Sequence, residues 1–503
     1  MRPAQPANFV TWFRAAAPWI HAFRGKTFVV AFGGEMVASG AVESVVQDVN
    51  LLTSLGIRVV IVCGSRPQID AALAARGLTS TFAHGVRITP SNVMDCVKEA
   101  VGRLRIEFEQ RFSFGLPNTP MAQSEGVRLM SGSLLTARPV GVIDGIDFQF
   151  AGTVRDVDAE TIHHALNNGD IVCLTPIGYS PTGEAFNLTM EDVAASVAVA
   201  LDAEKLIFMI DAAGLPPLPG PKTKRTRAHE ISRELSAAEA ETLYKAALRS
   251  STQASAQSAT LSPTQSPTQS AAQSAAQSAA QPSAQTSAHS PAPLPAHLPE
   301  VARMNDETMR ALDATVRASK GGVTRTHLIP RAVDGALLME LFSYNGTGTM
   351  ITEAGLETLR EATVEDVGGV LTLIEPLETD GTLVRRGREK LEAEIGQFCV
   401  IEHDNVIAGC AALYPFGKDG MGEMACFVVA PTFRGRNYGE QLLARIESLA
   451  RQARVKRLFV LTTRTAHWFI EHGFVEGSLD ELPEAKQKLY NYQRQSKIFI
   501  KKL

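Results

Sequence analysis

The sequence has few cysteines and lacks a long apolar run. Its six cysteines are scattered without the CxxC spacing or clustering of metal ligands, at Cys63, Cys96, Cys173, Cys399, Cys410 and Cys426. We therefore expect no metal site, and the pattern suits buried thiols in a reducing cytoplasm. No stretch approaches the roughly 20 apolar residues that cross a bilayer, and the first residues lack the apolar core of a secretory signal. These absences predict a cytoplasmic protein that does not enter a membrane.

An excess of either charge is also missing. The chain has 49 lysines and arginines against 53 acidic residues, which gives a net charge of -4. Basic residues never gather into a long run, so no nucleic-acid surface is expected. At 503 residues the chain is too long for a single core, and its length alone predicts two or more domains.

Apolar strands alternate with helices in the first half of the chain. Short β runs are expected in four segments, at 27–32, 57–64, 170–178 and 204–211. Helices are expected between them, including the alanine-rich segment 190–203. Strands this apolar, joined by helices, predict an α/β domain with a parallel sheet covered on both faces.

One internal segment has no acidic residue, lysine, arginine or aromatic residue. Residues 250–297 repeat Ser-Ala-Ala-Gln instead. This composition cannot bury enough apolar surface to offset its conformational entropy, so we expect the segment to be disordered. Strand and helix patterns resume after it and continue to 350. We therefore interpret it as a Ser/Ala/Gln/Pro loop insertion within the first domain, which is tolerated because closing a long loop costs little more than closing a short one.

The pattern changes near residue 350, where we place the division between two domains. A strand followed by a helix is expected over 359–378, and then a hairpin that turns at Asp404 and Asn405. An apolar strand ends at Pro431, and a loop leads into a helix at 440–453. We assign residues 356–503 to this second domain.

The loop before that helix has the composition of a phosphate-binding turn. It consists of Arg434, Gly435, Arg436, Asn437, Tyr438 and Gly439. Backbone N–H groups there can converge on an anion at the positive end of the helix, and the glycines let the backbone approach closely. Taken alone, the loop is equally consistent with a plain turn that caps a helix.

The surroundings of this loop resemble the GNAT acetyltransferase family. The evidence is R-G-x-x-x-G after VVAPTF, the later TTRTAHWFIEHGF, and the opening LREATVEDVGGVLTLI, in the family's order. The resemblance implies a mixed sheet that splays between its central strands, with acetyl-CoA in the gap. It also implies that backbone N–H groups of Cys426, Phe427 and Val428 bind the pantetheine arm.

Almost the whole chain, apart from the insertion, resembles the bacterial N-acetylglutamate synthase family. The segments RGKTFVVAFGGE, DGALLMELFSYNGTGTMI, VRRGREKLE and LPEAKQKLYNYQRQSK are among those that carry the resemblance. It implies acetyl transfer from acetyl-CoA to the α-amine of L-glutamate, the first step of arginine biosynthesis, with arginine as feedback inhibitor. It also implies a homo-oligomeric ring, commonly a hexamer.

A glutamate pocket needs cations, because the substrate presents two carboxylates. The resemblance assigns the pocket to Leu383, Arg385 or Arg386, Lys486, Arg494 and Ser496. For any one of these arginines, a solvated surface side chain is the alternative.

Catalysis needs a base that removes a proton from the substrate ammonium. We select Glu423, which directly precedes the predicted pantetheine-binding strand; a structural acid at a strand start is the alternative. A strand N–H near Cys426 is a candidate to stabilise the oxyanion. The general acid stays open: many GNAT enzymes have a tyrosine where this chain has Ile470, and Tyr438 and Thr462 are weaker candidates.

The first domain, over residues 21–350, resembles the amino acid kinase fold of acetylglutamate kinase. Such kinases hold phosphates with a lysine that here is Ala31, and with a glycine run that here reads Cys63-Gly64-Ser65-Arg66-Pro67. Without these groups we predict no kinase activity. Arg87 matches a kinase residue that binds a carboxylate, although a structural role is also open.

A kinase fold without activity suits a regulatory domain. We expect an N-terminal helix within residues 1–20, with Phe9, Phe13, Ala16 and Ile20 along one face. In arginine-sensitive relatives, this helix and a later segment form the effector site. The corresponding residues are Trp19, Glu340, Gly346 and Gly348. Glu340 would pair with the guanidinium of arginine, whereas an ordinary amphipathic helix and an acid beside the core are the alternative.

Three other functions compete with this interpretation. An acetylglutamate kinase with an accessory acyl-CoA-binding domain is disfavoured by Ala31. A non-catalytic arginine-binding regulator is disfavoured by the complete phosphate-binding loop and by Glu423. An acetyltransferase for another amine, such as a protein lysine, is disfavoured by the cationic residues of the pocket, which favour an acidic substrate.

Overall fold

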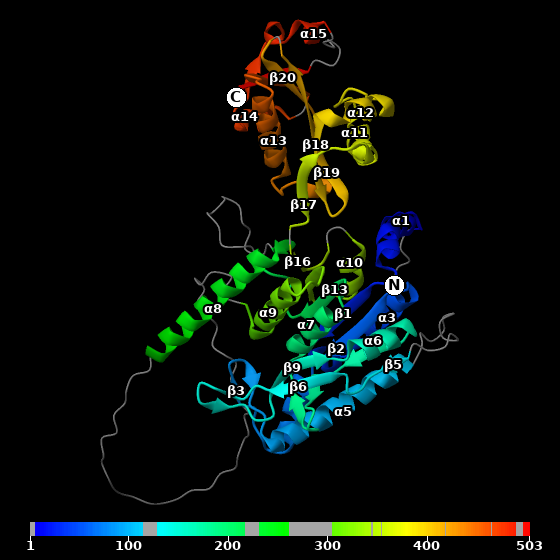
Figure 1. Ribbon diagram of the computed structural model, residues 1–503, viewed down its shortest axis with the longest axis vertical. Helices are drawn as coiled ribbons and strands as arrows, with labels where there is room; N and C mark the ends of the chain where they lie inside the picture. Colours follow the sequence, from blue (N-terminus) through cyan, green and yellow to red (C-terminus); the bar gives the residue numbers. More distant parts are fainter. Residues whose placement is uncertain are drawn as a thin grey trace, which may run out of the picture. The chain divides into compact units, whose positions relative to one another are not determined.

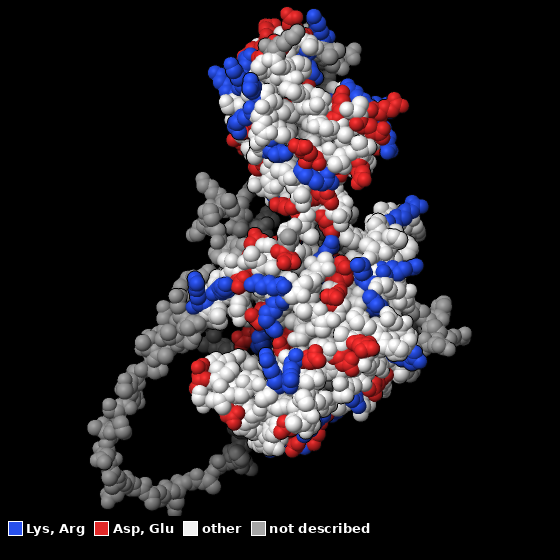
Figure 2. All heavy atoms as spheres, viewed as in Figure 1, with Lys and Arg blue, Asp and Glu red and all other residues white. Residues whose placement is uncertain are grey.

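The computed structural model describes residues 6–113, 128–216, 231–260, 304–343, 346–353, 355–417, 419–463, 465–488 and 496–503. The chain divides into two compact units, Met1–Ala354 and Gly355–Leu503 (Figure 1). No helix in these ranges combines the length and the apolar character that crossing a lipid bilayer requires. On the face that Figure 2 shows, acidic and basic side chains are interspersed over both units, so neither unit presents a large field of one sign there.

The first unit is built around an eight-stranded sheet, with the order β14-β16-β15-β13-β1-β2-β10-β5. The strands are β1 (Thr27–Phe32), β2 (Arg58–Cys63), β5 (Leu129–Met130), β10 (Ile171–Leu174), β13 (Lys205–Ile210), β14 (Glu234–Ser236), β15 (Arg325–Pro330) and β16 (Thr349–Thr352). β1 pairs in parallel with both β2 and β13, whereas β15 and β16 pair antiparallel. The parallel core of the sheet agrees with the prediction.

Helices cover both faces of this sheet because the side chains of β1 alternate between two buried clusters. Phe28, Val30 and Phe32 face one cluster, and Val29 and Ala31 face the other. The first cluster is completed by α3 (Val42–Ser54), α5 (Ser91–Ser113) and α10 (Ala336–Phe342). The second is completed by α6 (Ala159–Asn167), α7 (Met190–Ala200) and α9 (Asp306–Lys320). Side chains of a strand point alternately to the two faces of its sheet. Because both faces of β1 are apolar, helices must cover the sheet on both sides.

The remaining elements of the first unit lie around this sandwich. A four-stranded sheet contains β6 (Leu135–Pro139), β9 (Gly152–Val157), β11 (Ile177–Tyr179) and β12 (Ala185–Asn187). Two small hairpins are β3 (Phe82–Ala83) with β4 (Val86–Arg87) and β7 (Val142–Ile143) with β8 (Ile146–Asp147). The other helices are α1 (Pro6–Phe23), α2 (Glu35–Ala38), α4 (Arg66–Ala75) and α8 (Ala237–Thr260).

Helices α1 and α8 differ from the predictions. On α1, Ala16 is buried, but Phe9 and Phe13 are exposed, so only part of the expected apolar face is covered. Helix α8 continues to Thr260, so residues 250–260 are helical rather than disordered. Alanine and glutamine are good helix formers, and a helix that is already packed through Leu243 extends at little cost. The rest of the predicted insertion, 261–297, lies outside the described residues.

The second unit contains a seven-stranded sheet with the order β17-β18-β19-β20-β21-β23-β22. The strands are β17 (Glu357–Glu361), β18 (Phe398–His403), β19 (Val406–Phe416), β20 (Met421–Val429), β21 (Arg457–Thr462), β22 (Val475–Gly477) and β23 (Lys497–Lys502). The α-helices are α11 (Val367–Thr379), α12 (Arg388–Glu394), α13 (Tyr438–Gln452), α14 (Ala466–Glu471) and α15 (Glu484–Gln487). Short 3-10 turns are η3 (Val364–Asp366), η4 (Ile395–Gln397), η5 (Pro431–Phe433) and η6 (Leu479–Glu481).

Two strands in the middle of this sheet separate along their length. β20 and β21 pair in parallel from Met421 opposite Arg457 to Glu423 opposite Phe459. β20 then continues for six more residues to Val429, and its other edge stays paired with β19. The sheet therefore opens into a cleft after Glu423, as the predicted splayed fold requires.

Candidate functional site

A β-bulge in β20 bends this strand at the cleft. Cys410 lies opposite Val428 and Ala412 lies opposite Ala425, so β20 has one residue more than β19 between these pairs. Cys426, within the bulge, has a φ of +47°. An extra residue bends a strand and turns its backbone groups out of the regular ladder. The bulge therefore helps to separate β20 from β21.

The cleft is a cavity of about 740 Å³. Cavities of roughly 300–1,000 Å³ are typical of small-molecule sites. Eight residues that were predicted to bind acetyl-CoA line it: Cys426, Phe427, Val428, Arg434, Gly435, Asn437, Tyr438 and Gly439. Further lining residues that the sequence did not point to include Leu377, Thr382, Val460, Thr465, Trp468 and Phe469.

The predicted phosphate-binding loop has the backbone geometry of an anion site. Gly435 has a φ of +87° and Asn437 a φ of +63°, so the chain coils sharply before α13 begins at Tyr438. The Asn437 side chain makes no capping hydrogen bond to the helix. The first N–H groups of an uncapped helix can bind an anion, assisted by the helix dipole.

Arg436 and Tyr438 of this loop are held by a buried histidine. The hydroxyl group of Tyr438 lies 2.7 Å from Nδ1 of His403, and a guanidinium nitrogen of Arg436 lies 3.5 Å from Nε2 of the same ring. The Arg436 guanidinium also lies 5.7 Å from the ring centre of Phe433. Arg436 thus contacts His403 and Phe433 and is not among the residues that line the cavity. Its contact with CoA stays a prediction. The buried hydroxyl of Tyr438 is poorly placed as a general acid.

Thr462 and Ile470, the other positions considered for the general acid, differ in their surroundings. The hydroxyl groups of Thr462 and Thr465 lie 2.9 Å apart, and both residues line the cavity. Ile470 is half exposed on α14. Thr462 is therefore the better placed of the two, and the identity of an acid stays open.

Glu423 and Lys486 form an ion pair where β20 and β21 part. The Nζ atom of Lys486, on α15, lies 2.5 Å from a carboxylate oxygen of Glu423. The Glu423 side chain is 8% exposed, and that of Lys486 is 25% exposed. Glu423 occupies the last position where the two strands pair, and Met424, the next residue, already lines the cavity. The pair thus lies at the closed end of the cleft.

Arg386 contacts the bulge directly. Its Nη1 lies 2.7 Å from Sγ of Cys426, and its guanidinium lies 5.8 Å from the ring centre of Tyr414. The hydroxyl group of Tyr414 donates to a carboxylate oxygen of Glu394 at 2.7 Å. Burial raises the pKa of the Cys426 thiol to about 11. A neutral thiol is a poor nucleophile, in agreement with direct transfer rather than a cysteine intermediate.

The other four predicted substrate-binding residues differ in their surroundings. Leu383 lines the cavity, and Ser496 is buried directly before β23. Arg385 is exposed. Arg494 lies outside the described residues. Of the predicted set, Leu383 therefore lines the cavity, and Arg386 contacts Cys426 in its wall. Lys486 is not among the residues that line the cavity, and it contacts Glu423 where the two strands part.

The kinase-like loops of the first unit lack the expected cation. Ala31 is fully buried in β1, within one of the apolar clusters. A methyl group there cannot stabilise the charge that develops during phosphoryl transfer. The absence of kinase activity stays a prediction.

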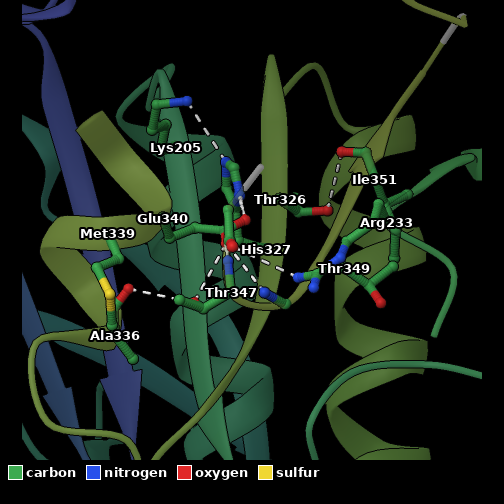
Figure 3. A network of polar contacts seen from close by, with 12 residues as sticks. Lys205, Arg233, Thr326, His327, Ala336, Met339, Glu340, Thr347, Thr349 and Ile351 are labelled. Atoms are coloured by element: carbon green, nitrogen blue, oxygen red, sulfur yellow. Dashed lines mark hydrogen bonds and ion pairs between the residues drawn. The ribbon is translucent and has the colours of Figure 1, made fainter. Parts of the chain in front are cut away.

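A buried polar cluster in the first unit contains the predicted effector residue Glu340 (Figure 3). Nδ1 of His327 lies 2.8 Å from one carboxylate oxygen of Glu340, and Nζ of Lys205 lies 3.4 Å from Nε2 of His327. The other Glu340 oxygen accepts hydrogen bonds from the N–H groups of Thr347 at 2.5 Å and Gly348 at 3.0 Å. The cluster joins β13, β15 and α10 through one carboxylate.

The pKa values of His327 and Glu340, two ionisable groups of this cluster, are both lowered. Burial, together with the charge of Lys205, lowers the pKa of His327. Burial acts to raise the pKa of Glu340, but hydrogen bonds from His327, Thr347 and Gly348 outweigh it and lower that pKa to about 2. Glu340 is therefore a buried, charged acceptor.

Trp19 reaches this cluster through one intervening ring. Its ring centre lies 5.9 Å from that of Phe23, and the Phe23 ring lies 4.9 Å from Nζ of Lys205 and 6.0 Å from the ring of Phe342 on α10. Sequence reasoning missed Lys205 and His327. A charged residue at the start of an apolar strand, as in EKLIFMID, was the signal for Lys205.

The two loop glycines of the predicted effector site fit closely around the cluster. Gly346 has a φ of +52° and lies beside the Glu340 carboxylate, and a Cβ at Gly348 would meet the Leu328 carbonyl oxygen. A side chain at Gly348 would thus displace β15 or the loop that binds Glu340.

Comparison with known proteins identifies both units. The chain matches the Amino acid kinase family over residues 26–262 and the Acetyltransferase (GNAT) family over residues 370–474. It is 46% identical to an amino-acid acetyltransferase of Ralstonia nicotianae, over 99% of this chain and 96% of that protein. It is 44% identical to an amino-acid acetyltransferase of Ectopseudomonas mendocina, over 99% and 100%.

Two crystal structures resemble the whole chain. Both are of N-acetylglutamate synthase from Neisseria gonorrhoeae, at 34% identity, and the match covers 98% of this chain and 99% of that one. One is complexed with coenzyme A and L-arginine and superposes with a TM-score of 0.76. The other is complexed with coenzyme A and N-acetyl-glutamate and has a TM-score of 0.54.

Proposed function

Because the chain belongs to the amino-acid acetyltransferase family, we propose that it transfers the acetyl group of acetyl-CoA to the α-amine of L-glutamate. The product is N-acetylglutamate, and the reaction begins arginine biosynthesis. The observation that carries this proposal is the ion pair of Glu423 and Lys486 at the closed end of the cleft. It combines a base for the substrate ammonium and a cation for a substrate carboxylate in one place.

The cleft supports a direct transfer of the acetyl group. The N–H groups of the loop before α13 bind the pyrophosphate, and the free edge of β20 holds the pantetheine arm along the bulge. Glu423 takes a proton from the substrate ammonium, directly or through a water molecule. The amine then attacks the thioester carbon, and a strand N–H near Cys426 stabilises the oxyanion. As the oxyanion collapses, the C–S bond breaks, and the leaving CoA thiolate takes up the proton that the nitrogen loses when the amide forms.

The ion pair also couples substrate binding to the base. The Nζ atom of Lys486 lies 2.5 Å from a carboxylate oxygen of Glu423. A substrate carboxylate that binds Lys486 competes for this cation and makes the Glu423 carboxylate available to the ammonium. Arg386, whose guanidinium contacts Cys426 in the bulge, is the second cation of the pocket and is suited to the other carboxylate.

The relative from Neisseria gonorrhoeae supports an acidic substrate, because one of its structures contains coenzyme A together with N-acetyl-glutamate. A protein lysine, the competing acceptor, would bring a positive charge toward Lys486 and Arg386. Like charges at such distances oppose binding.

Feedback inhibition by arginine is the second part of the proposal. The other structure of that relative contains L-arginine. In this chain Glu340 is a buried carboxylate of the kinase-like unit, with a pKa lowered to about 2, so it is charged and suited to a guanidinium. The guanidinium replaces His327 as the hydrogen-bond donor to Glu340, and the 346–348 loop changes with it.

One assay tests both parts. The purified full chain is mixed with acetyl-CoA and L-glutamate, and the release of free CoA is measured with and without arginine. Equimolar L-glutamine, which lacks one carboxylate, and a lysine-containing peptide serve as alternative acceptors. Release with L-glutamate that exceeds both acceptors at least tenfold supports the substrate. Absence of release with L-glutamate contradicts the central proposal, whereas release that is indifferent to arginine contradicts only the regulatory one.

We also propose that the chain forms a cytoplasmic homo-oligomer, with a hexamer as the expected state. Exposed aromatic side chains on α1, at Phe9, Trp12 and Phe13, support association, because clustered apolar surface marks contact sites. All six cysteines are buried free thiols, which supports a reducing compartment. Light scattering coupled to size-exclusion chromatography measures the mass, and a monomer at micromolar concentration contradicts the proposal.

A further inference from the structure

Two apolar side chains bound the cleft of the second unit at the end where its strands meet. β20 and β21 pair as far as Glu423 opposite Phe459, so Met424 and Val460 are the first residues beyond the last pair. Both line the cavity, and they are only 1% and 5% exposed. Both belong to the same buried cluster, so their side chains lie on one face of the sheet. Met424 and Val460 therefore form an apolar end wall at the closed end of the cleft.

Packed side chains support this end wall on both flanks. Leu413 of β19 is the cross-strand partner of Met424, and Phe499 of β23 is the cross-strand partner of Val460. Both partners are buried in the same cluster as the end wall. Cross-strand partners lie side by side on one face of a sheet, and a closely packed interior has little room for additional volume. The position of the end wall is therefore fixed.

The end wall lies on the face of the sheet that holds the acyl donor. The phosphate-binding loop leads directly into α13, which packs in the same cluster through Leu442 and Ile446. Trp468 and Phe469 of α14 pack against this cluster and line the cavity as well. Coenzyme A that is held by the loop therefore extends its pantetheine arm along this face of β20, toward the end wall.

Glu423 faces the opposite side of the sheet. Successive side chains of a strand point to opposite faces, so the side chains of Glu423 and Met424 diverge. Tyr414, the cross-strand partner of Glu423, packs against a different cluster, and Lys486 contacts the Glu423 carboxylate. The amine of the acceptor and the acyl group of the donor thus reach the closed end from different faces. Because the acceptor occupies the side of Glu423, the methyl group of the donor faces the end wall.

We propose that Met424 and Val460 determine which acyl group the enzyme transfers, because they leave room for the methyl group of acetyl-CoA and exclude a longer chain. One methylene group in an apolar pocket changes kcat/KM by about 10–200-fold. The inference rests on the proposed transfer to L-glutamate and adds the specificity for the donor.

The chemistry is the same for every acyl group. The C–S bond of the thioester breaks and a C–N bond forms. One proton of the ammonium passes through Glu423 to solvent, and a second passes to the CoA thiolate. A longer chain therefore changes only the fit against the end wall.

The test compares two acyl donors on the purified full chain. Release of coenzyme A from acetyl-CoA and from propionyl-CoA is measured with saturating L-glutamate, and kcat/KM is obtained for each donor. The unmodified chain is expected to favour acetyl-CoA by about tenfold or more. Equal values for the two donors overturn this inference alone. Absence of release from both donors contradicts the proposed function and, with it, this inference.

Two variants enlarge the space at the end wall. Met424→Ala and Val460→Ala each shorten one of its side chains and are expected to raise the ratio of kcat/KM for propionyl-CoA to that for acetyl-CoA by about tenfold or more. Met424→Leu nearly conserves the volume and is expected to keep the preference for acetyl-CoA. A purely structural role of these residues would lower the values for both donors together and leave the ratio unchanged.

Met421→Ala is the matched control. Met421 lies on the same strand and is as deeply buried as Met424, but it is not among the residues that line the cavity. Its replacement is expected to leave the ratio unchanged. Thermal unfolding verifies that each variant is folded, and Val460→Ala alone carries the test if Met424→Ala does not fold. An unchanged ratio in the folded end-wall variants, or an equal change in Met421→Ala, overturns the proposal.

Discussion

Glu423 and Lys486 hold opposite charges 2.5 Å apart, with the carboxylate 8% exposed. Replacement of Glu423 by glutamine keeps the shape of the side chain but removes the base. We expect kcat to fall by about 10²–10⁴-fold, the usual contribution of a general base, while the affinity for coenzyme A changes less than twofold. Steady-state kinetics and calorimetry with coenzyme A measure the two effects.

The matched control is Glu476→Gln, which removes an exposed carboxylate that pairs with Lys497 on the same unit. It is expected to leave kcat within twofold of the original. A Glu423→Gln enzyme that retains its full rate at neutral pH would remove Glu423 as the base.

At the scale of residues, the sequence predicted which residues line the cofactor cavity better than it predicted the contacts between side chains. The predicted CoA-binding set falls almost entirely on one cavity, because a local loop and one strand position it. The pairing of Lys486 with Glu423, the contact of Arg386 with Cys426, and the anchoring of Tyr438 by His403 were not foreseen. These contacts depend on side-chain directions and on strands distant in sequence, which a pattern does not encode.

The turn before α13 depends on backbone conformations that favour glycine. At Gly435, φ is +87° and open space surrounds the position of a Cβ, so the effect of alanine there comes from strain alone. Left-handed backbone costs a non-glycine residue about 1–2 kcal/mol, which corresponds to about tenfold weaker binding of coenzyme A if the loop relaxes. Gly396→Ala is the control, because that glycine also has open space but no positive φ. Equal coenzyme A affinities for the two variants would contradict the assignment of the loop.

The loop between α10 and β16 depends on the charge of Glu340. The pKa of this carboxyl group is lowered from 4.5 to about 2, so its ionised form stabilises the folded state. Because a depressed pKa stabilises the folded state only while the group is ionised, this contribution is complete above pH 4.5 and is lost as pH falls toward 2. Glu340→Gln should therefore lower the free energy of unfolding at pH 7, and its difference from the unmodified chain should shrink below pH 4.5.

Urea unfolding of the first unit at several pH values measures this difference. A constant difference between pH 7 and pH 3 would show that Glu340 stabilises the fold by packing rather than by charge. The ratio of activities with and without arginine, measured on the same variant, shows whether the carboxylate also binds the effector.

At the scale of elements, the order of strands and helices followed from hydrophobic patterns, and the parallel core of the first sheet was predicted correctly. The bulge at Cys426 and the helix over 250–260 were not. A bulge is a mismatch between two strands and so has no signature in either one. The end of α8 was misjudged because a repeat that cannot form a core can still extend an existing helix.

The whole molecule combines two compact units with separate cores. Each unit should unfold with its own ligand dependence, because a ligand stabilises only the fold that binds it. At 100 times its Kd, coenzyme A should stabilise the acetyltransferase unit by about 2.7 kcal/mol. Calorimetric scans should show one transition that moves with coenzyme A and another that moves with arginine. Movement of both transitions with either ligand would indicate strong coupling between the units.

The parting of β20 and β21 after Glu423 also affects the behaviour of the molecule in solution. An unpaired strand edge is a template for adding a foreign strand, and folded proteins usually protect such edges. Here the bulge bends the edge, and coenzyme A bound along β20 as proposed above would cover the rest. Bound coenzyme A or acetyl-CoA would thus also protect the enzyme against aggregation. A cell that depletes its whole pool of coenzyme A and acetyl-CoA would leave this enzyme both inactive and prone to self-association.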